Sequence, residues 1–251
     1  MKSSDLRNVV LLGHGGMGKT SLAEAMLYNS GAIDRLGRIN EGNTVLDCDP
    51  EEIRRKASVS LSVAPFDWKG STVNIIDTPG YFDFAGEMLE GVSVVDSAVI
   101  VVSSTMSVGT EKAWEFANSR NIPRVIFVNK MHDENADFDK IYAELKEMLG
   151  KPCVALQLPI RKNGKFVGVV DGITMQARMF DDFGNLVDGE LPPHMVDRAE
   201  EIHLNLSEIV AETDNELMEK FFGGERFTRE EIIKGLKVAI NNCTCAPVLL
   251  G

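Results

Sequence analysis

Residues 13–20, Gly-His-Gly-Gly-Met-Gly-Lys-Thr, constrain the fold of this chain more than any other stretch. They follow an apolar run at 9–12 and precede a helical pattern at 21–28. Glycines at this spacing before Lys-Thr, between a strand and a helix, are typical of a P-loop that binds phosphate groups. A chance glycine-rich turn is the alternative, and the strand and helix on either side disfavour it.

Each residue type in this loop suits a phosphate ligand. Glycines let the backbone turn so that its N–H groups point at phosphate oxygens, and the helix N-terminus adds partial positive charge. Lys19 would contact the β- and γ-phosphates, and the Thr20 hydroxyl would ligate Mg²⁺. The predicted nucleotide-binding residues here are Gly13, His14, Gly15, Gly16, Met17, Gly18, Lys19, Thr20 and Ser21.

A second motif, Asp77-Thr78-Pro79-Gly80, ends a predicted strand at 73–76. D-x-x-G alone is a weak signal, but after a strand and downstream of a P-loop it is typical of the loop's magnesium-binding partner. We expect Asp77 to bind Mg²⁺ through water and the Gly80 N–H to sense the γ-phosphate. Thr78 and Pro79 complete the predicted contacts of this motif with the nucleotide.

Predicted strands and helices alternate along the first part of the chain. Apolar runs at 98–102 and 124–128 indicate buried strands, and helical patterns lie at 110–121 and around 141–149. The alternation predicts an α/β, three-layer P-loop NTPase fold with a mostly parallel sheet and helices on both faces. Ligands bind at the carboxyl ends of such strands, where both motifs lie.

The segment 31–57 is polar and irregular by pattern. After a P-loop helix it suits a mobile switch, and a plain disordered loop is the alternative. Alternation at Val59, Leu61 and Val63 then predicts a half-buried strand, and residues 68–71 predict a hairpin turn.

The pattern changes after about residue 157. Asn163-Gly164 predicts a hairpin, 178–187 predicts another, and a long helix is predicted from about 195. Capping boxes are predicted at Thr213 with Glu216 and at Thr228 with Glu231. The apolar end of the chain predicts a strand that returns to the main sheet. We therefore expect a P-loop domain over 1–157, an inserted α+β subdomain over 158–245 and the last strand over 246–251.

The bulk composition excludes several classes of protein. Hydrophobic residues are 44% and charged residues 25% of 251, which is ordinary for a soluble globular chain. No apolar run reaches the length of a membrane span, and residues 1–5 show no secretory or transit pattern, so we expect a cytoplasmic protein. The net charge of −12 argues against a general nucleic-acid-binding surface.

The cysteines and histidines give no strong metal signal. Only Cys243 and Cys245 are close in sequence, and no second pair or histidine cluster accompanies them. We expect reduced thiols rather than a zinc site. His194 and His203 fall in the predicted insertion, where a solvent-facing position is expected rather than a ligand role.

The P-loop, the D-x-x-G motif, Asn129-Lys130-Met131-His132 and the insertion together resemble the nucleotide-binding domain of bacterial elongation factor G. Residues 75–80 and 127–131 are similar to the family's second and third signatures. Residues 168–171 and 216–220 resemble its inserted subdomain. The resemblance covers nearly the whole chain, and the insertion separates this family from other translational GTPases.

The resemblance implies a function and a setting. It implies a GTP- and GDP-binding GTPase with Mg²⁺ that acts on the ribosome, in tRNA–mRNA translocation or in ribosome recycling. Departures from the family pattern point to a divergent paralogue. Because the family's next motif would begin after Gly251, we expect the N-terminal part of a longer protein. We expect it to be monomeric and to meet the ribosome as the full-length protein.

Tyr81 stands where the family carries the histidine that positions the attacking water. The predicted catalytic residues are therefore Tyr81, Lys19 and Gly80. A tyrosine, with a pKa near ~10, is a poor base, so we expect very slow intrinsic hydrolysis. Tyr81 either orients water on the ribosome or only packs beside the switch.

The guanine motif of the family is N-K-x-D, and here His132 replaces the aspartate. A carboxylate accepts two hydrogen bonds from guanine, whereas a histidine offers at most one acceptor. A register slip that brings in Asp133 is the alternative. Asn129, Lys130 and His132 are the predicted base contacts, and guanine stays the expected base with weaker binding or relaxed specificity.

Two smaller departures affect the predicted cation sites. Gly16 replaces an aspartate that helps hold a monovalent cation in the family. Ser58 replaces the switch threonine and keeps its hydroxyl, although an ordinary surface serine is the alternative. The predicted magnesium ligands are Thr20, Ser58 and Asp77.

Three functional hypotheses remain from the sequence. The first is a translational GTPase whose turnover depends on the ribosome. The second is a nucleotide-gated switch that binds the ribosome and barely hydrolyses GTP, which Tyr81 favours. The third is an NTPase with relaxed base specificity, which His132 favours.

Overall fold

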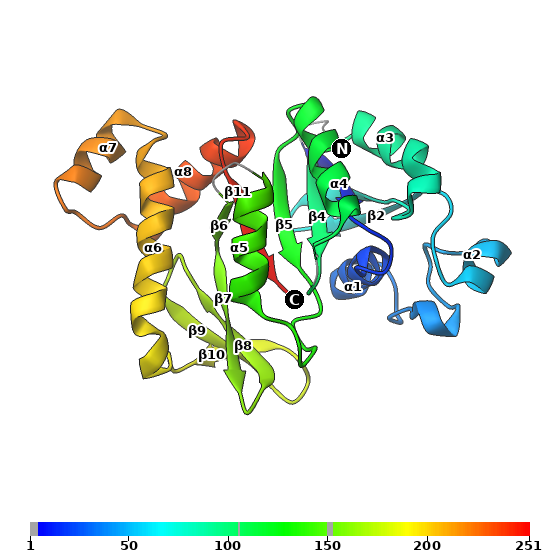
Figure 1. Ribbon diagram of the computed structural model, residues 1–251, viewed down its shortest axis with the longest axis horizontal. Coiled ribbons are helices and arrows are strands. Elements are labelled where there is room, and N and C mark those ends of the chain that lie inside the picture. The colour runs from blue at the N-terminus through cyan, green and yellow to red at the C-terminus, as the bar shows by residue number, and fades with distance from the viewer. Residues whose placement is uncertain (1–4, 105, 150–152) are drawn as a thin grey trace. The chain divides into compact units, whose positions relative to one another are not determined.

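The computed structural model describes residues 5–104, 106–149 and 153–251 (Figure 1). The first four residues, on which part of the expectation about targeting rests, lie outside this range. The chain divides into two compact units. Unit 1 contains the described residues up to Val102 and those from Met106 to Arg124. Unit 2 contains Ser103, Ser104 and the described residues from Val125 to Gly251.

Within the described residues, unit 1 contains four adjacent strands in the order β2-β3-β1-β4. β1 is parallel to β3 and to β4, and β2 is antiparallel to β3. The strands are β1 (Leu6–Leu12), β2 (Ser62–Trp68), β3 (Ser71–Asp77) and β4 (Ser97–Val102). The carboxyl ends of β1 and β3 therefore lie side by side, where the P-loop and the D-x-x-G motif begin.

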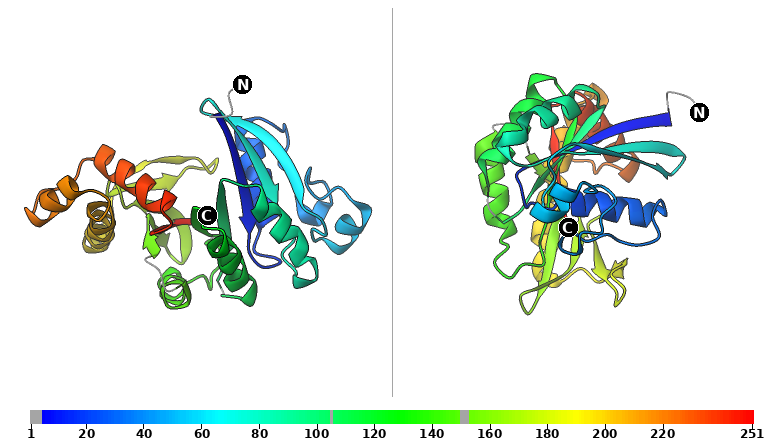
Figure 2. Two further views of the ribbon diagram at one scale, coloured as in Figure 1. Left: turned by 90° about the horizontal axis from the view of Figure 1, so that it is seen from above. Right: turned by 90° about the vertical axis from the view of Figure 1, so that its right-hand side faces the viewer.

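Helices cover both faces of these strands. α1 (Lys19–Ser30) lies on one face, and α3 (Ala85–Ser93) and α4 (Val108–Ser119) lie on the other (Figure 2). The central strands are apolar because both faces are covered; Leu11 and Leu12, for example, are fully buried. Each such side chain stabilises the fold by roughly 1.5–3 kcal/mol relative to exposure. The predicted P-loop strand and the helix after it are confirmed.

The segment between α1 and β2 is more regular than its pattern indicates. It contains a short 3₁₀ helix (Ile39–Glu41) and α2 (Pro50–Arg55), so the expectation of an irregular stretch is wrong there. Asp49 caps α2 in a capping box with Glu52. The sequence carried this signal, because an aspartate followed three residues later by glutamate favours a helix start.

The β2–β3 connection is the predicted hairpin turn, and the strand before it begins later than predicted and continues to the turn. Trp68 pairs with Ser71, and both Lys69 and Gly70 have positive φ angles, which fits a two-residue hairpin turn. β2 begins at Ser62, so Val59 and Leu61 precede the strand.

Unit 2 carries its own parallel strands, in the order β5-β11-β6. The chain's end therefore returns beside β5, as predicted. Between β5 and β6 lies α5 (Phe138–Leu149), whose apolar face is buried. The strands are β5 (Arg124–Val128), β6 (Cys153–Ala155) and β11 (Ala246–Leu250), with β6 not anticipated from the sequence.

A separate antiparallel sheet in unit 2 has the order β10-β9-β8-β7. Both predicted hairpins form in it. Its strands are β7 (Gln157–Lys162), β8 (Lys165–Asp171), β9 (Gln176–Phe180) and β10 (Leu186–Gly189). A 3₁₀ turn (Pro193–Met195) then leads to α6 (Val196–Ala211), α7 (Asn215–Phe222) and α8 (Arg229–Asn241). These helices share a buried core that includes Leu206, Val210, Ile232 and Leu236.

Only one of the two predicted capping boxes in this region forms. Thr228 and Glu231 cap α8 reciprocally. At α7 the cap is Asp214, whose carboxylate accepts the Glu216 amide, so the predicted box at Thr213 is wrong. The Thr213 hydroxyl donates instead to the carbonyl of Val210 in the preceding helix. A shift of one residue places a stronger cap former at the helix start.

The α/β fold class is confirmed, with a mostly parallel sheet flanked by helices and an antiparallel sheet beside it. The exact limits of the inserted subdomain stay a prediction. Among the described residues, no helix combines the length and the apolar character that crossing a membrane requires.

Candidate nucleotide-binding site

The P-loop backbone takes conformations that only glycine adopts without strain. Gly13, Gly16 and Gly18 all have positive φ angles, and Gly18 caps α1 in the left-handed conformation. At Gly13 a side chain is also excluded by space, because a Cβ would overlap the Val101 carbonyl oxygen. The loop between β1 and α1 therefore depends on its glycines for both angle and close approach.

Lys19 lies buried under the loop. Its Nζ donates to the carbonyl of Gly13 at 2.9 Å and to that of His14 at 3.1 Å. Burial lowers the pKa of this ammonium to about 8, while Asp77 and Asp47 oppose the shift. The side chain is thus fixed at the P-loop, in the place where a phosphate-binding lysine acts.

A cluster of hydroxyl and carboxylate oxygens lies beside Lys19. The Thr20 hydroxyl donates to Asp77 Oδ2 at 2.6 Å and lies 3.2 Å from Ser58 Oγ. Asp77 Oδ1 is buried with no hydrogen-bond partner among the described residues, and burial raises the pKa of this carboxyl to about 7. This all-oxygen set fits Mg²⁺, because hard cations take oxygen ligands and an orphaned buried carboxylate oxygen needs a partner. The structure thus brings the three predicted metal ligands together.

Asp47 is a member of this cluster that sequence reasoning missed. Its carboxylate is buried and hydrogen-bonded to the Ser58 hydroxyl, and burial raises its pKa. Its second oxygen, Oδ2, has no hydrogen-bond partner in the described part of the chain. No motif marks this position, because it lies in a segment that the pattern predicts to be irregular.

The D-x-x-G motif touches the P-loop directly. The Gly15 amide donates to the Gly80 carbonyl at 3.0 Å, and a Cβ on Gly80 would lie 2.5 Å from Lys19 Nζ. The Thr78 hydroxyl donates to the carbonyl of Leu11 at 2.7 Å and ties the motif to β1. The observed contact uses the Gly80 carbonyl, whereas the expected γ-phosphate contact uses its N–H.

Tyr81 lies against the P-loop with its ring half exposed. A Cβ on Gly15 would lie 2.9 Å from Tyr81 Cζ, and the ring meets that of His14 edge-on at 6.2 Å between centroids. The His14 Nδ1 atom is buried without a hydrogen-bond partner among the described residues. This position is compatible with both hypotheses for Tyr81, packing and water orientation.

A buried carboxylate from α1 holds the segment that follows this helix. Glu24 is fully buried and accepts the amides of Gly37, Val45 and Leu46 at 2.6 to 3.2 Å. Hydrogen bonds to an ionised acceptor are among the stronger ones in proteins. The loop that carries Asp47 is therefore tied to the helix that carries Thr20.

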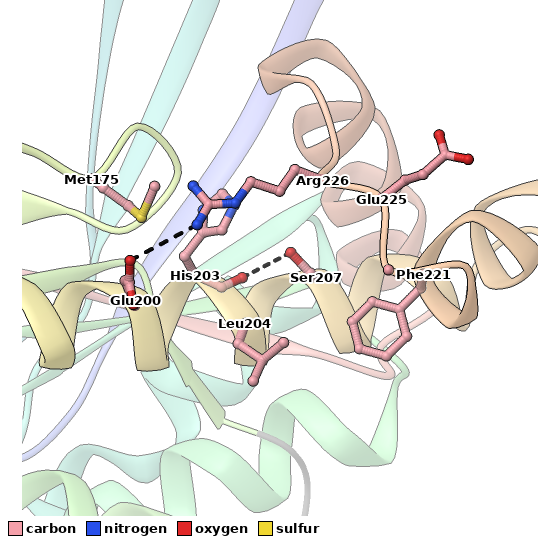
Figure 3. Close-up of a pocket in the computed structure, with 9 residues that line it drawn as sticks. Met175, Glu200, His203, Leu204, Ser207, Phe221, Glu225 and Arg226 are labelled. Atoms are coloured by element: carbon pink, nitrogen blue, oxygen red, sulfur yellow. Dashed lines mark hydrogen bonds and ion pairs between the residues drawn. The ribbon is translucent and has the colours of Figure 1, made fainter.

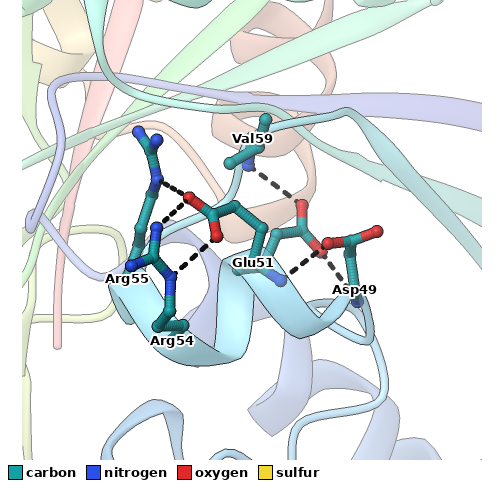
Figure 4. Close-up of polar contacts among 6 residues, drawn as sticks. Asp49, Glu51, Arg54, Arg55 and Val59 are labelled. Carbon is teal, nitrogen blue, oxygen red and sulfur yellow. Dashed lines mark hydrogen bonds and ion pairs between the residues drawn. The ribbon is translucent and has the colours of Figure 1, made fainter.

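Glu52 of α2 plays the same part for the residues around Ser58. It accepts the Asp49 amide at 3.3 Å, the Val59 amide at 2.9 Å and the Ser60 amide at 3.2 Å. Its neighbour Glu51 faces outward and pairs with Arg54 and Arg55 (Figure 4). The two adjacent glutamates therefore differ: Glu52 is buried and accepts backbone amides, whereas Glu51 pairs with arginines at the surface.

The predicted base contacts lie in unit 2, in the loop after β5. Asn129 Oδ1 accepts the Lys130 amide at 2.8 Å, and Lys130 has a φ of 62°. Met131 is fully buried, and its amide donates to the Gly251 carbonyl at 2.9 Å. The His132 side chain is 76% exposed, with its Nε2 3.5 Å from Asp133 Oδ1.

A further pocket of about 330 Å³ lies in unit 2 beside α6 (Figure 3). Arg226 faces Glu200 across it at 3.8 Å, and His203 Nδ1 lies 3.0 Å from the Gly172 carbonyl oxygen. His194 is exposed. Among the described residues, no group of three or more His, Cys, Asp or Glu side chains is arranged to hold a metal ion.

The chain matches a known protein family, described as Elongation factor Tu GTP binding domain, over residues 4–241. It belongs to this family. It is accordingly a GTP-binding domain of the translational GTPase type, and the P-loop, Asp77 and Asn129-Lys130 lie in the matched range.

A solved protein from Thermus thermophilus has a closely similar fold. The two share 35% sequence identity with a TM-score of 0.92, and the match covers 99% of this chain. It covers 38% of the Thermus chain, so the GTP-binding domain described here spans well under half the length of that relative.

Proposed function

We propose that this domain binds GTP and GDP with Mg²⁺ and hydrolyses GTP as part of a ribosome-associated translation factor. The observation that supports the proposal is the cluster at the P-loop of buried Lys19, Thr20 and Asp77 with the partly buried Ser58. A lysine cation, hydroxyls and a carboxylate at the carboxyl ends of parallel strands suit a magnesium-bound triphosphate.

Each residue has a part in the proposed mechanism. The P-loop amides and Lys19 bind the β- and γ-phosphates and stabilise the charge that develops between them during cleavage. Thr20 and Ser58 would hold Mg²⁺, with Asp77 beside them as the carboxylate that would hold it through water. When bound, the ion neutralises phosphate charge. Tyr81 orients the attacking water when the domain is bound to the ribosome.

The base is proposed to be guanine, recognised by Asn129 and Lys130. His132 replaces the family's aspartate and offers fewer acceptors to the guanine edge. We therefore propose that guanine binds more weakly than it would to a carboxylate.

The role of the full-length protein is proposed as translocation or ribosome recycling. This rests on the resemblance to elongation factor G, including its inserted subdomain. A second candidate is a nucleotide-gated switch with little hydrolysis, and Tyr81 at the P-loop favours it because tyrosine is a poor general base.

Isothermal calorimetry of the 251-residue chain tests the binding proposal. GDP with Mg²⁺ should bind, and Lys19→Ala should weaken it by about a hundredfold because a buried charge-assisted contact is lost. Lys69→Ala, at a hairpin turn, is the matched control and should bind as the wild type does. Equal binding by wild type and Lys19→Ala would overturn the proposal, as would tighter binding of ATP than of GTP.

Single-turnover hydrolysis by the full-length protein separates the two candidates. The enzyme proposal expects ribosomes to accelerate GTP hydrolysis. The switch proposal expects no acceleration, with ribosome binding that still depends on GTP.

A further inference from the structure

Arg161, on β7 of unit 2, reaches the loop that carries the proposed base contacts. Its Nη2 donates to the carbonyls of Met131 at 2.7 Å, Ala136 at 2.9 Å and Asp133 at 3.4 Å. Its Nη1 donates to the Gly164 carbonyl at 2.8 Å. One side chain therefore connects three carbonyls of the loop that follows β5 to the β7–β8 hairpin.

The hairpin is shaped to aim this side chain. The β7–β8 register shifts between Ile160 and Arg161, and such an irregularity re-aims the side chain beside it. Asn163 and Gly164 both have positive φ angles in the tight turn, which brings the Gly164 carbonyl back to Arg161. A guanidinium suits this place because it offers five donors in a rigid planar fork.

Met131 is the point at which the loop is fixed. Its carbonyl accepts from Arg161, its amide donates to Gly251, and its side chain is fully buried. Lys130 and His132 are the residues on either side, and the His132 side chain is largely exposed. The placement of His132 therefore depends on how firmly the Met131 backbone is held, since an exposed side chain contributes little order of its own.

Each of these hydrogen bonds from Arg161 goes to a main-chain carbonyl. The contact therefore does not depend on which side chains the loop carries. The neighbouring carboxylate of Asp139 is paired with Arg198. An arginine bonded to the backbone in this way fixes the position of a loop, whereas a surface ion pair contributes little.

We propose that Arg161 is a positioning residue for base recognition. It fixes the loop from Lys130 to Ala136 so that its side chains meet the purine base in one arrangement. The inference rests on the proposed function, because it assumes that this loop contacts the base. Arg161 would raise the affinity for the base part of the nucleotide and leave the affinity for the phosphate part unchanged.

The test compares GDP with tripolyphosphate, which carries phosphates and no base. Both affinities are measured by calorimetry with Mg²⁺ on the 251-residue chain. Arg161→Ala should weaken GDP about tenfold, the equivalent of losing one or two hydrogen bonds, and leave tripolyphosphate within about twofold. Arg161→Lys should also lose affinity for GDP, because an ammonium lacks the planar fork. Arg178→Ala, in the same antiparallel sheet, is the control and should match the wild type.

The possible outcomes separate the two proposals. A wild-type chain that binds no GDP overturns the proposed function and this inference with it. If the wild type binds GDP and the Arg161 variants keep the same ratio of GDP affinity to tripolyphosphate affinity, the inference alone is overturned. An equal loss for both ligands also overturns it, because that is the result of general destabilisation. If Arg161→Ala fails to fold by circular dichroism, Arg161→Lys decides.

Discussion

Two loops of this chain each follow a buried parallel strand, and they are built in opposite ways. The P-loop in unit 1 takes its shape from glycines with positive φ, and its lysine is buried against backbone carbonyls. The loop after β5 in unit 2 exposes His132 and is fixed from outside, by Arg161 and by Gly251.

The difference teaches where substitution is tolerated. A phosphate site made of backbone amides fails when a Cβ enters it, so its sequence pattern is strict. The loop after β5, which we propose as the base site, is held through its backbone, so an exposed side chain on it can change while the backbone contacts remain. His132 in place of aspartate is such a change, and the backbone of Met131 beside it is still held.

The largest expected effect is on the P-loop. Gly13→Ala places a Cβ in overlap with the Val101 carbonyl oxygen at a φ of 138°, so we expect a loss of about 3 kcal/mol in the free energy of unfolding. Gly16 also has a positive φ, but a Cβ there would meet open space, so Gly16→Ala should lower the free energy of unfolding by about 1 kcal/mol. Urea unfolding measures both. Equal losses in the two variants would show that the overlap with the Val101 carbonyl oxygen adds nothing to the cost of Gly13→Ala.

The next prediction concerns Glu24, which holds the segment carrying Asp47 as Arg161 holds the loop after β5. In Glu24→Gln the side-chain amide nitrogen would face at least one backbone N–H that the carboxylate now accepts, which should cost about 1–3 kcal/mol. Amide hydrogen exchange at Val45 and Leu46 should accelerate. Glu51→Gln, an exposed glutamate in the same region, is the control; equal exchange in the two variants would refute a special role for Glu24.

A smaller effect sharpens the contrast at the base. His132→Asp restores a carboxylate that accepts two hydrogen bonds from guanine, so GDP affinity should rise about tenfold. Tripolyphosphate binding should not change, and His194→Asp, at an exposed histidine of unit 2, should behave as the wild type. A gain shared by GDP and tripolyphosphate would contradict base recognition by this loop.

The smallest expected effect decides between His132 and its neighbour. Asp133→Asn should leave GDP affinity within about twofold, because we assign the base contact to position 132 and an exposed Asp–His pair contributes little. Calorimetry with GDP and Mg²⁺ measures it. A tenfold loss would instead mean that Asp133 supplies the guanine carboxylate through a shift of register.

Much of the architecture could be predicted because local patterns and the fold agree. The P-loop helix, the Lys69-Gly70 turn and the α8 capping box each form where short-range chemistry indicates. The errors arise where local signals compete. At α7 two adjacent residues, Thr213 and Asp214, both suit the cap, and aspartate is the stronger former.

The candidate site divides in the same way. Thr20, Ser58 and Asp77 were predicted as partners, and the structure brings their oxygens together. Asp47 and Arg161 were not singled out as site residues. Arg161 lies 30 residues from Met131 and 25 from Ala136, whose carbonyls it contacts, and no motif links Asp47 to Ser58. An aspartate in a polar loop or an arginine in a hairpin also has many ordinary explanations.

By itself, the sequence determined the P-loop, the strand–helix alternation and the order of the motifs, because glycine angles and hydrophobic periods act over a few residues. Only the tertiary structure decided which charged groups are buried and what they hold. Glu24 and Glu51 are the same residue type, yet Glu24 is fully buried and accepts three backbone amides, whereas Glu51 pairs with arginines at the surface. Burial depends on what packs above a side chain, and those segments are distant in sequence.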